Sequence, residues 1–215
     1  MIELLHTDCM DYMRGLHDKA FGLAIVDPPY GIGGNSTRAG KFSRGAGKLK
    51  GRAIQRYSTS WDVAPTAEYF SELFRVSENQ IIWGGNYFSL PRARCIICWD
   101  KVQPWKNFSQ CEMAWTSFNR PAKLFRLDNR TGGKIHPTQK PVNLYKWILD
   151  NFAEPGSRIL DTHLGSGSIA LACHETGFDL VGCEIDKAYY DGARERLANF
   201  RRQQAFGLGK QEKRG

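Results

Sequence analysis

The chain of 215 residues is 41% hydrophobic and 24% charged, which suits one globular domain with a buried core. Thirty Lys and Arg against 22 Asp and Glu give a net charge of +8, and this balance favours an anionic partner, above all nucleic acid. No apolar run approaches the roughly 20 residues that span a bilayer, and residues 1–8 lack the basic start of a secretory signal. We therefore expect a cytoplasmic protein without a membrane partner.

The first half of the chain alternates apolar runs with short amphipathic stretches. Cys9, Met13 and Leu16 mark one face of a short helix, and a second helix follows Pro65. A short run that is apolar throughout is typical of a strand buried in a sheet. Such runs predict strands at residues 2–6, 21–26, 80–83, 95–99 and 112–115.

The second half continues this alternation after a polar interruption. Residues 117–134 are polar and basic, and we predict a small insertion that carries a hairpin. Pro141 opens a helix, Gly177 ends another, and the basic residues from Arg201 are expected to fray. The remaining predicted strands are 158–160 and 180–183, and the predicted helices include 145–152, 169–174 and 190–200.

Strands that alternate with helices imply an α/β fold, with a mostly parallel sheet and helices on both of its faces. Ligands of such sheets bind at the carboxyl ends of the strands. We predict one domain over residues 1–200, followed by a basic tail over 201–215. Within the domain, segments 31–60 and 117–135 are the candidates for contact with nucleic acid.

A metal site is not expected, although the chain has six cysteines. Cys95 and Cys98 form a CxxC pattern inside a predicted strand, where alternation places them on opposite faces and prevents them from sharing a zinc ion. No second CxxC or HxxxH pattern follows. Buried reduced thiols are the better interpretation.

The segment 31–60 is rich in glycine, and all of its charged side chains are positive. It holds seven of the 22 glycines and no acidic residue. A solvated loop is one interpretation, but solvation does not require a single sign of charge, so we favour a loop that contacts phosphates. Its basic residues are Arg38, Lys41, Arg44, Lys48, Lys50, Arg52 and Arg56.

Residues 161–168, Asp-Thr-His-Leu-Gly-Ser-Gly-Ser, follow one predicted strand and open a helix. Glycines there permit a tight turn and a close approach of the backbone to a ligand. Glu184 ends the next strand, 19 residues after Gly165, where an acid is placed to bind ribose hydroxyls. The pattern indicates an adenosine-containing cofactor, although the third glycine of GxGxxG and the lysine of a P-loop are absent. An ordinary strand-to-helix turn is the alternative.

Residues 27–30, Asp-Pro-Pro-Tyr, end another predicted strand. The two prolines remove two N–H donors, so the strand end offers a carboxylate and free carbonyls beside an aromatic ring. Such acceptors suit the amino group of a nucleobase: Asp27 and the Pro28 carbonyl can accept its two hydrogens, while Tyr30 stacks on the ring. A turn capped by Asp27 is the alternative.

A third motif, His-Pro-Thr-Gln-Lys-Pro at 136–141, precedes a helix. By itself it indicates a helix cap with proline in the first turn. Together and in this order, the three motifs resemble those of DNA methyltransferases that methylate amino groups with S-adenosylmethionine, in particular the beta group of N6-adenine enzymes. The resemblance extends over almost the whole chain, from about Ile2 to Phe200.

The resemblance implies a circularly permuted Rossmann-like fold and assigns roles to single residues. The catalytic set is Asp27, Pro28, Pro29 and Tyr30. The cofactor set is Asp8 and Cys9 after the first strand, His136 and Lys140 in a closing segment, and Asp161, Gly165, Ser166, Gly167 and Glu184. His163 departs from the family, which often has Phe there, and the segment before His136 is short for target recognition, so segment 31–60 is expected to share that work.

The resulting interpretation is a DNA adenine N6-methyltransferase that acts on a flipped base of double-stranded DNA, with a homodimer as a further candidate assembly. Asp27 favours adenine, because serine is commoner at that position in the cytosine enzymes of the family. The same chemistry on cytosine N4 or on RNA stays open. Two alternatives from other classes are a nucleic-acid-binding relative without catalysis and a nicotinamide-dependent oxidoreductase.

Overall fold

The computed structural model describes residues 1–32, 62–103, 109–128 and 139–211, with residues 206–211 described by their backbone alone. The predicted basic segment 31–60 lies outside the described residues except for Gly31 and Ile32. The end of segment 117–135 and the last four residues of the chain lie outside them as well.

The described residues form one eight-stranded sheet with the order β1-β8-β7-β2-β3-β5-β4-β6. β5 runs antiparallel to both of its neighbours, and all other pairings are parallel, so the predicted mostly parallel sheet is confirmed. The strands are β1 (Ile2–His6), β2 (Phe21–Val26), β3 (Ser77–Trp83), β4 (Ile96–Asp100), β5 (Cys111–Thr116), β6 (Lys123–Arg126), β7 (Arg158–Asp161) and β8 (Asp179–Glu184).

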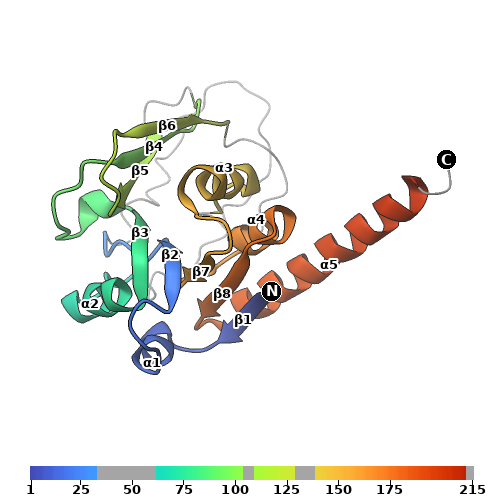
Figure 1. Cartoon of the computed structure of the whole chain (residues 1–215), viewed down its shortest axis with the longest axis horizontal. Helices are drawn as coiled ribbons and strands as arrows, with labels where there is room; N and C mark the ends of the chain where they lie inside the picture. The colour runs from blue at the N-terminus through green and yellow to red at the C-terminus, as the bar shows by residue number, and fades with distance from the viewer. Residues whose placement is uncertain (33–61, 104–108, 129–138, 212–215) are drawn as a thin grey trace, which may run out of the picture.

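Helices cover both faces of the sheet (Figure 1). Because side chains alternate along a strand, Leu23 and Ile25 of β2 enter one apolar cluster, while Ala24 and Val26 enter the other. The first cluster includes α3 (Val142–Phe152), α4 (Ser168–Thr176) and α5 (Lys187–Gln211), and the second includes α1 (Cys9–Arg14) and α2 (Ala67–Val76).

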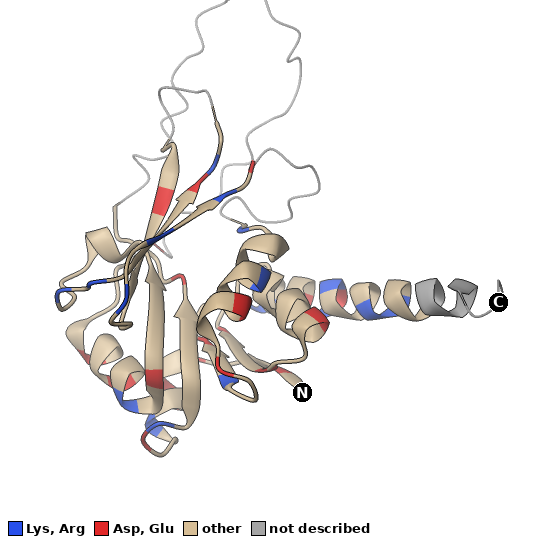
Figure 2. Cartoon of the chain, turned by 45° about the horizontal axis from the view of Figure 1, so that its top comes forward, with Lys and Arg blue, Asp and Glu red and all other residues tan. Residues whose placement is uncertain are grey.

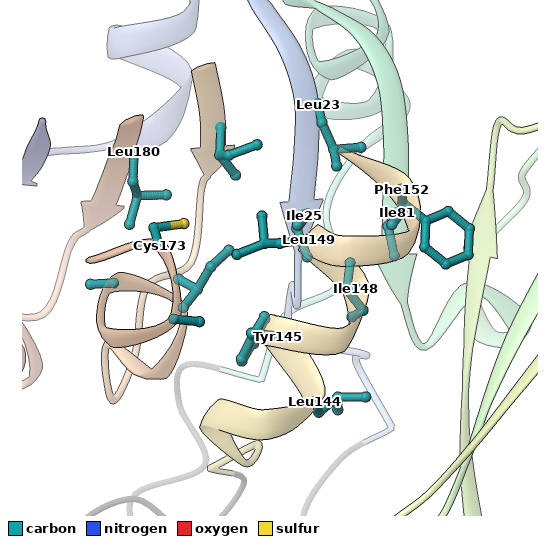
Figure 3. Close-up of a cluster of buried hydrophobic side chains, with 14 of the residues drawn as sticks. Leu23, Ile25, Ile81, Leu144, Tyr145, Ile148, Leu149, Phe152, Cys173 and Leu180 are labelled. Atoms are coloured by element: carbon teal, nitrogen blue, oxygen red, sulfur yellow. The ribbon is translucent and has the colours of Figure 1, made fainter. Parts of the chain in front are cut away.

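Helix α3 fills the middle of the first cluster (Figure 3). Its apolar residues recur at the spacing of one helix face, as the sequence predicts, and they point at β2 and β3 on one side and at α4 on the other. This packing holds the loop before α3 against the carboxyl ends of the strands. The buried residues of α3 are Leu144, Tyr145, Ile148, Leu149 and Phe152.

The predicted hairpin in residues 117–134 is wrong for the part that the structure describes. β6 pairs parallel with β4, with Leu124 beside Cys98, and so extends the main sheet. Phe125 of β6 packs on Trp147 of α3, with ring centroids 5.1 Å apart. This aromatic contact draws the short apolar piece onto the edge of the sheet, an outcome that local turn signals do not encode.

The predicted fraying from Arg201 is also wrong, because α5 continues to Gln211. Phe200 anchors the helix on the first cluster, and Arg, Gln and Ala in the following turns are good helix formers. The C-terminal half of α5 extends away from the sheet and carries basic positions such as Arg201 and Arg202 (Figures 1 and 2). No helix in the described ranges is both long and apolar enough to cross a membrane.

The sheet order reverses between β7 and β2, the point that positions the site. After β2 the chain moves outward to β3, whereas after β7 it moves in the opposite direction to β8. The two strands lie side by side, with Ala24 beside Leu160. In an open α/β sheet, the loops that leave such a pair of strands in opposite directions open a crevice for ligands.

Candidate active site

Two of the predicted motifs leave the sheet at this crevice. Asp27 follows β2 and Asp161 ends β7, so the pairing of these strands brings the Asp-Pro-Pro-Tyr motif next to the glycine-rich turn. Glu184 ends β8 on the other side of β7. The strand order therefore brings the catalytic and cofactor motifs together at the carboxyl edge of the sheet, where the sequence predicts them.

Asp27 is held from two sides. The Tyr30 hydroxyl donates to its Oδ1 over 2.7 Å, and Lys140 Nζ donates to its Oδ2. The Asp27 side chain is 21% exposed, whereas that of Lys140 is only 2% exposed. The carboxylate therefore faces the crevice with a fixed orientation, and its remaining lone pairs are available to a ligand.

Lys140 bridges Asp27 to a second acid, Glu112 of β5, with 3.3 Å between its Nζ and Glu112 Oε2. Lys101 contacts the other oxygen of Glu112 at 2.5 Å. Burial by itself lowers the pKa of Lys140, but Asp27 and Glu112 outweigh burial and hold that pKa above its ordinary value. Burial raises the pKa of Glu112, yet Lys140 and Lys101 reverse this and hold it below its ordinary value. Lys140 and Glu112 are therefore both charged.

This arrangement gives Lys140 a contact that the sequence did not predict, and its expected cofactor role stays a prediction. The family resemblance places Lys140 in a segment that closes over the cofactor, whereas the structure pairs it with the catalytic carboxylate. Glu112 was not predicted as a site residue. The available signal was a charged residue within an otherwise apolar strand, because Glu112 is followed by Met113, Ala114 and Trp115.

Tyr30 lies in an aromatic stack beside Asp27. Its ring is parallel to that of Tyr87, with centroids 4.9 Å apart and 19° between the planes. Gly84 permits this contact, because a Cβ at this position, where φ is +67°, would lie 2.2 Å from the Tyr30 ring. Burial and then the Asp27 charge raise the pKa of Tyr30 far above its ordinary value, so its hydroxyl stays protonated and donates. Tyr87 is 51% exposed.

The glycine-rich turn and Glu184 are joined by a hydrogen bond. The Gly165 N–H donates to Glu184 Oε2 over 2.8 Å, and the Asp186 N–H donates to Glu184 Oε1 over 2.9 Å. Gly165 has φ +50°, and a Cβ there would meet only the His163 carbonyl oxygen, at 3.9 Å. The turn thus leaves open space above its backbone beside a buried carboxylate.

Asp161 ends β7 and His163 follows it, at the carboxyl edge of the sheet between the two motifs. Burial raises the pKa of Asp161 to about 7, although its Oδ1 accepts the His163 N–H over 3.0 Å. Burial lowers the pKa of His163 to about 4, so its ring is neutral. His163 Nδ1 lies 2.9 Å from the Thr162 hydroxyl, which in turn contacts the Tyr69 hydroxyl of α2 at 2.7 Å. A neutral histidine with one nitrogen engaged replaces the phenylalanine that the family often has.

Other predicted cofactor residues have structural partners. Gly167 packs against α5, since a Cβ there would lie 3.0 Å from the Ala193 Cβ. The Ser166 hydroxyl contacts that of Ser168 at 3.2 Å within the turn. Asp8 caps α1 by accepting the Met10 N–H over 2.7 Å. These contacts explain the residue types without a ligand, so cofactor roles for Gly167, Ser166 and Asp8 stay predictions.

The cysteines have no metal-binding arrangement. All six are free, and the residues that the structure describes include no group of three or more potential metal ligands. Cys95 is buried, as predicted, whereas Cys98 is half-buried. Burial and then Asp8 raise the pKa of the Cys9 thiol to about 12, so it stays protonated beside the crevice.

Several predicted contacts involve residues outside the described ranges. These residues are His136 and the seven basic residues from Arg38 to Arg56. The described residues that flank segment 33–61 lie together, however, because the Gly31 N–H donates to Asp62 Oδ1 over 2.9 Å. Both flanks therefore lie directly beside Tyr30 and the catalytic motif.

A permuted, mostly parallel sheet with these two motifs at its reversal point defines the class of Rossmann-like methyltransferases. Residues 55–195 match the family model of the N6/N4 DNA methylases, and the chain belongs to this family. It is accordingly a DNA methyltransferase, and the nicotinamide-dependent oxidoreductase considered above is excluded.

Individual relatives agree with this assignment. The chain is 30% identical to a protein described as "Putative methylase YubD" of Escherichia coli (strain K12), over 94% of this chain and 92% of the relative. The M1.HpyAVI–SAM complex has the same fold, with a TM-score of 0.59 and 20% identity over 92% of this chain and all of that one. The cytosine-N4-specific PvuII DNA methyltransferase also superimposes, with a TM-score of 0.59 and 11% identity over 93% of this chain and 90% of that one.

Proposed function

We propose that this protein transfers a methyl group from S-adenosylmethionine to the exocyclic N6 of an adenine flipped out of double-stranded DNA. The observation that carries this proposal is the Asp27 carboxylate, which Tyr30 and Lys140 hold at the crevice next to the glycine-rich turn. An intact acceptor site of this kind argues against a relative that has lost catalysis.

The residues of the crevice fit the cofactor. The open space above Gly165 would receive the methionine part, and Glu184, whose oxygens each keep a lone pair, would accept the ribose hydroxyls. When bound, S-adenosylmethionine supplies an electrophilic methyl group on a positively charged sulfur. The M1.HpyAVI methyltransferase, which shares this fold, forms a complex with the same cofactor.

Asp27 would prepare the amino group for attack. The nitrogen lone pair of an exocyclic amine is delocalised into the base and is a poor nucleophile. Acceptance of its hydrogens by Asp27 and the Pro28 carbonyl favours a tetrahedral nitrogen, and the carboxylate stabilises the positive charge that develops there. Tyr30 and Tyr87 offer aromatic faces for the flipped base.

Adenine is favoured over cytosine by the first residue of the tetrapeptide. Asp27 matches the adenine enzymes of the family, whereas serine is commoner in the cytosine enzymes. Cytosine N4 is the second candidate, since the PvuII enzyme shares the fold and is cytosine-specific.

Contact with the DNA backbone is assigned to the basic segment 31–60. Its flanking residues lie beside Tyr30, and its seven basic side chains would neutralise phosphates around the flipped base. The short segment 117–135 is the second candidate for contact with DNA, and the two segments would share target recognition.

Methyl incorporation tests the proposal. The purified protein is incubated with labelled S-adenosylmethionine and, in separate reactions, with DNA duplexes of varied sequence or with RNA, and the modified base is identified by mass spectrometry. N6-methyladenine is the expected product. N4-methylcytosine would keep the fold and the cofactor but overturn the substrate, and label found in RNA alone would overturn DNA.

A further inference from the structure

We propose that Glu112 and Lys140 form a positioning pair for methyl transfer, in which Lys140 fixes the Asp27 carboxylate and Glu112 offsets the charge of Lys140. This inference rests on the proposed function, adds Glu112 to the residues involved and specifies the part that Lys140 has in the reaction. Lys140 comes from the loop before α3 and Glu112 from the antiparallel strand β5, so neither belongs to the strand that carries Asp27.

The geometry excludes a chance surface contact. The Lys140 side chain is 2% exposed and lies between Asp27 and Glu112, while its Nζ is 5.0 Å from the centroid of the Trp83 ring. A buried lysine with two carboxylates and an aromatic face has few alternative positions, so it holds Asp27 in one rotamer. Exposed ion pairs do not impose such order.

The charges of this network balance. Asp27 and Glu112 contribute two negative charges, and Lys140 and Lys101 contribute two positive charges. A positive charge beside Asp27 is costly during the reaction, because the attacking nitrogen becomes positive as the methyl group arrives. Glu112 compensates for this cost by placing a second negative charge against Lys140.

This reasoning predicts what each residue contributes to rate. Loss of Lys140 frees the Asp27 side chain, and loss of the Glu112 charge leaves Lys140 uncompensated next to the reacting nitrogen. The ion pairs of both side chains within the described residues are with Asp27, with Lys101 and with each other, so we expect binding of the cofactor product S-adenosylhomocysteine to depend little on either. The cost of removing Glu112 exists only while Lys140 is present.

The experiment compares Glu112→Gln with Glu175→Gln in the full-length protein. Glu175 is a matched control: its side chain is also 27% exposed and contacts a lysine, Lys146, at 3.2 Å, away from the crevice. We expect Glu112→Gln to lower kcat for DNA methylation about 10- to 100-fold, with KM for DNA and calorimetric affinity for S-adenosylhomocysteine within about twofold of wild type. Glu112→Asp, which keeps the charge, is expected to recover most of this kcat.

A double-mutant cycle separates positioning from general damage to the structure. In a Lys140→Met background, Glu112→Gln is expected to change kcat less than about threefold, because no uncompensated charge remains. Equal losses in both backgrounds, or a kcat of Glu112→Gln equal to that of Glu175→Gln, would overturn the inference while the wild-type enzyme stays active. A wild-type protein that methylates no DNA would instead overturn the proposed function, and the positioning pair with it.

Discussion

Three carboxylates at the crevice have different environments, and these environments divide their tasks. Asp27 is partly exposed and has donors on both oxygens. Asp161 is buried with one backbone donor, and burial raises its pKa to about 7. Burial also raises the pKa of Glu184, although the backbone N–H groups of Asp186, Gly165 and Ile185 oppose this. Asp27 is therefore the acid suited to meet a substrate directly.

Asp27→Ala is expected to abolish methyl transfer and to leave cofactor binding nearly unchanged, because Asp27 and Glu184 end different strands. Methyl incorporation and calorimetric titration with S-adenosylhomocysteine measure the two effects. Asp27→Asn, which keeps the shape, controls for folding and is expected to be similarly inactive. Full activity in a verified Asp27→Ala protein would contradict the mechanism.

Tyr30→Phe tests how much of the site depends on the hydroxyl. It removes the donor to Asp27 Oδ1 but keeps the ring against Tyr87, so we expect a modest loss of kcat. Tyr30→Ala also removes stacking, which is worth about 1 to 3 kcal/mol per base, and is expected to be the more severe variant. Steady-state methylation kinetics of both variants check this order, and the reverse order would argue against stacking.

Glu184→Ala is expected to weaken the binding of S-adenosylmethionine by about 1 to 3 kcal/mol, the scale of hydrogen bonds to a charged acceptor. It also removes the acceptor of the Gly165 N–H, so the turn loses one hydrogen bond to β8 and keeps the one from the Leu164 N–H to the Cys183 carbonyl. Calorimetric titration measures the affinity, with Glu175→Ala as a control acid on α4. An unchanged affinity in a folded variant would remove Glu184 from the cofactor site.

Asp161→Asn is expected to stabilise the ligand-free protein at high pH. The folded protein holds the Asp161 proton up to about pH 7, whereas the ordinary pKa of an Asp in an unfolded chain is 3.8. Wild-type stability therefore falls as pH rises through this window. The variant has no carboxyl group that titrates at this position. Its free energy of unfolding should therefore exceed that of the wild type by about 2 to 4 kcal/mol above pH 7 and by almost nothing near pH 4. Denaturant unfolding across this pH range measures the gain, with exposed Asp150→Asn expected to show none.

Two glycines with a left-handed backbone conformation flank α4 and have different surroundings. Gly167, at φ +70°, lies against Ala193 of α5, whereas Gly177, at φ +80°, ends α4 with open space around its Cβ position. Gly177→Ala should cost about 1 to 2 kcal/mol of stability, the conformational term alone. Gly167→Ala should cost more, since α5 must also move.

The difference in stability between these two alanine variants measures the energetic cost of the close contact between Gly167 and α5. We expect Gly167→Ala to lower the free energy of unfolding by about 1 to 2 kcal/mol more than Gly177→Ala. Urea unfolding of both variants measures it. Equal losses would show that the contact between Gly167 and α5 adds no constraint.

For the complete chain, the net charge of +8 predicts salt-dependent binding to DNA. Replacement of Lys48, Lys50 and Arg52 by Gln should flatten the slope of log affinity against log salt by roughly 2 to 3 units. The control removes the same charge from α5 by replacement of Arg194, Arg201 and Arg202. Fluorescence titrations of a duplex at several salt concentrations measure both slopes, and an unchanged slope in the first variant would make segment 31–60 a solvated loop.

The amino-acid sequence was sufficient for the order of the strands and helices along the chain and for the motifs at the strand ends. Apolar runs at 21–26 and 180–183 and the helical spacing from Tyr145 to Phe152 are local patterns, and local patterns determine local structure. The approach of Gly165 to Glu184 was also predictable, since a parallel βαβ unit brings the carboxyl ends of its strands together.

The tertiary structure alone decided which distant charges meet. Lys140 reaches Asp27 across 113 positions in sequence, and Glu112 joins them because β5 inserts antiparallel between β3 and β4. β6 likewise joins the sheet through the contact of Phe125 with Trp147. Such pairings depend on strand order and on the packing of whole helices, and burial then selects the partners, because a lysine removed from water must meet acids to stay charged.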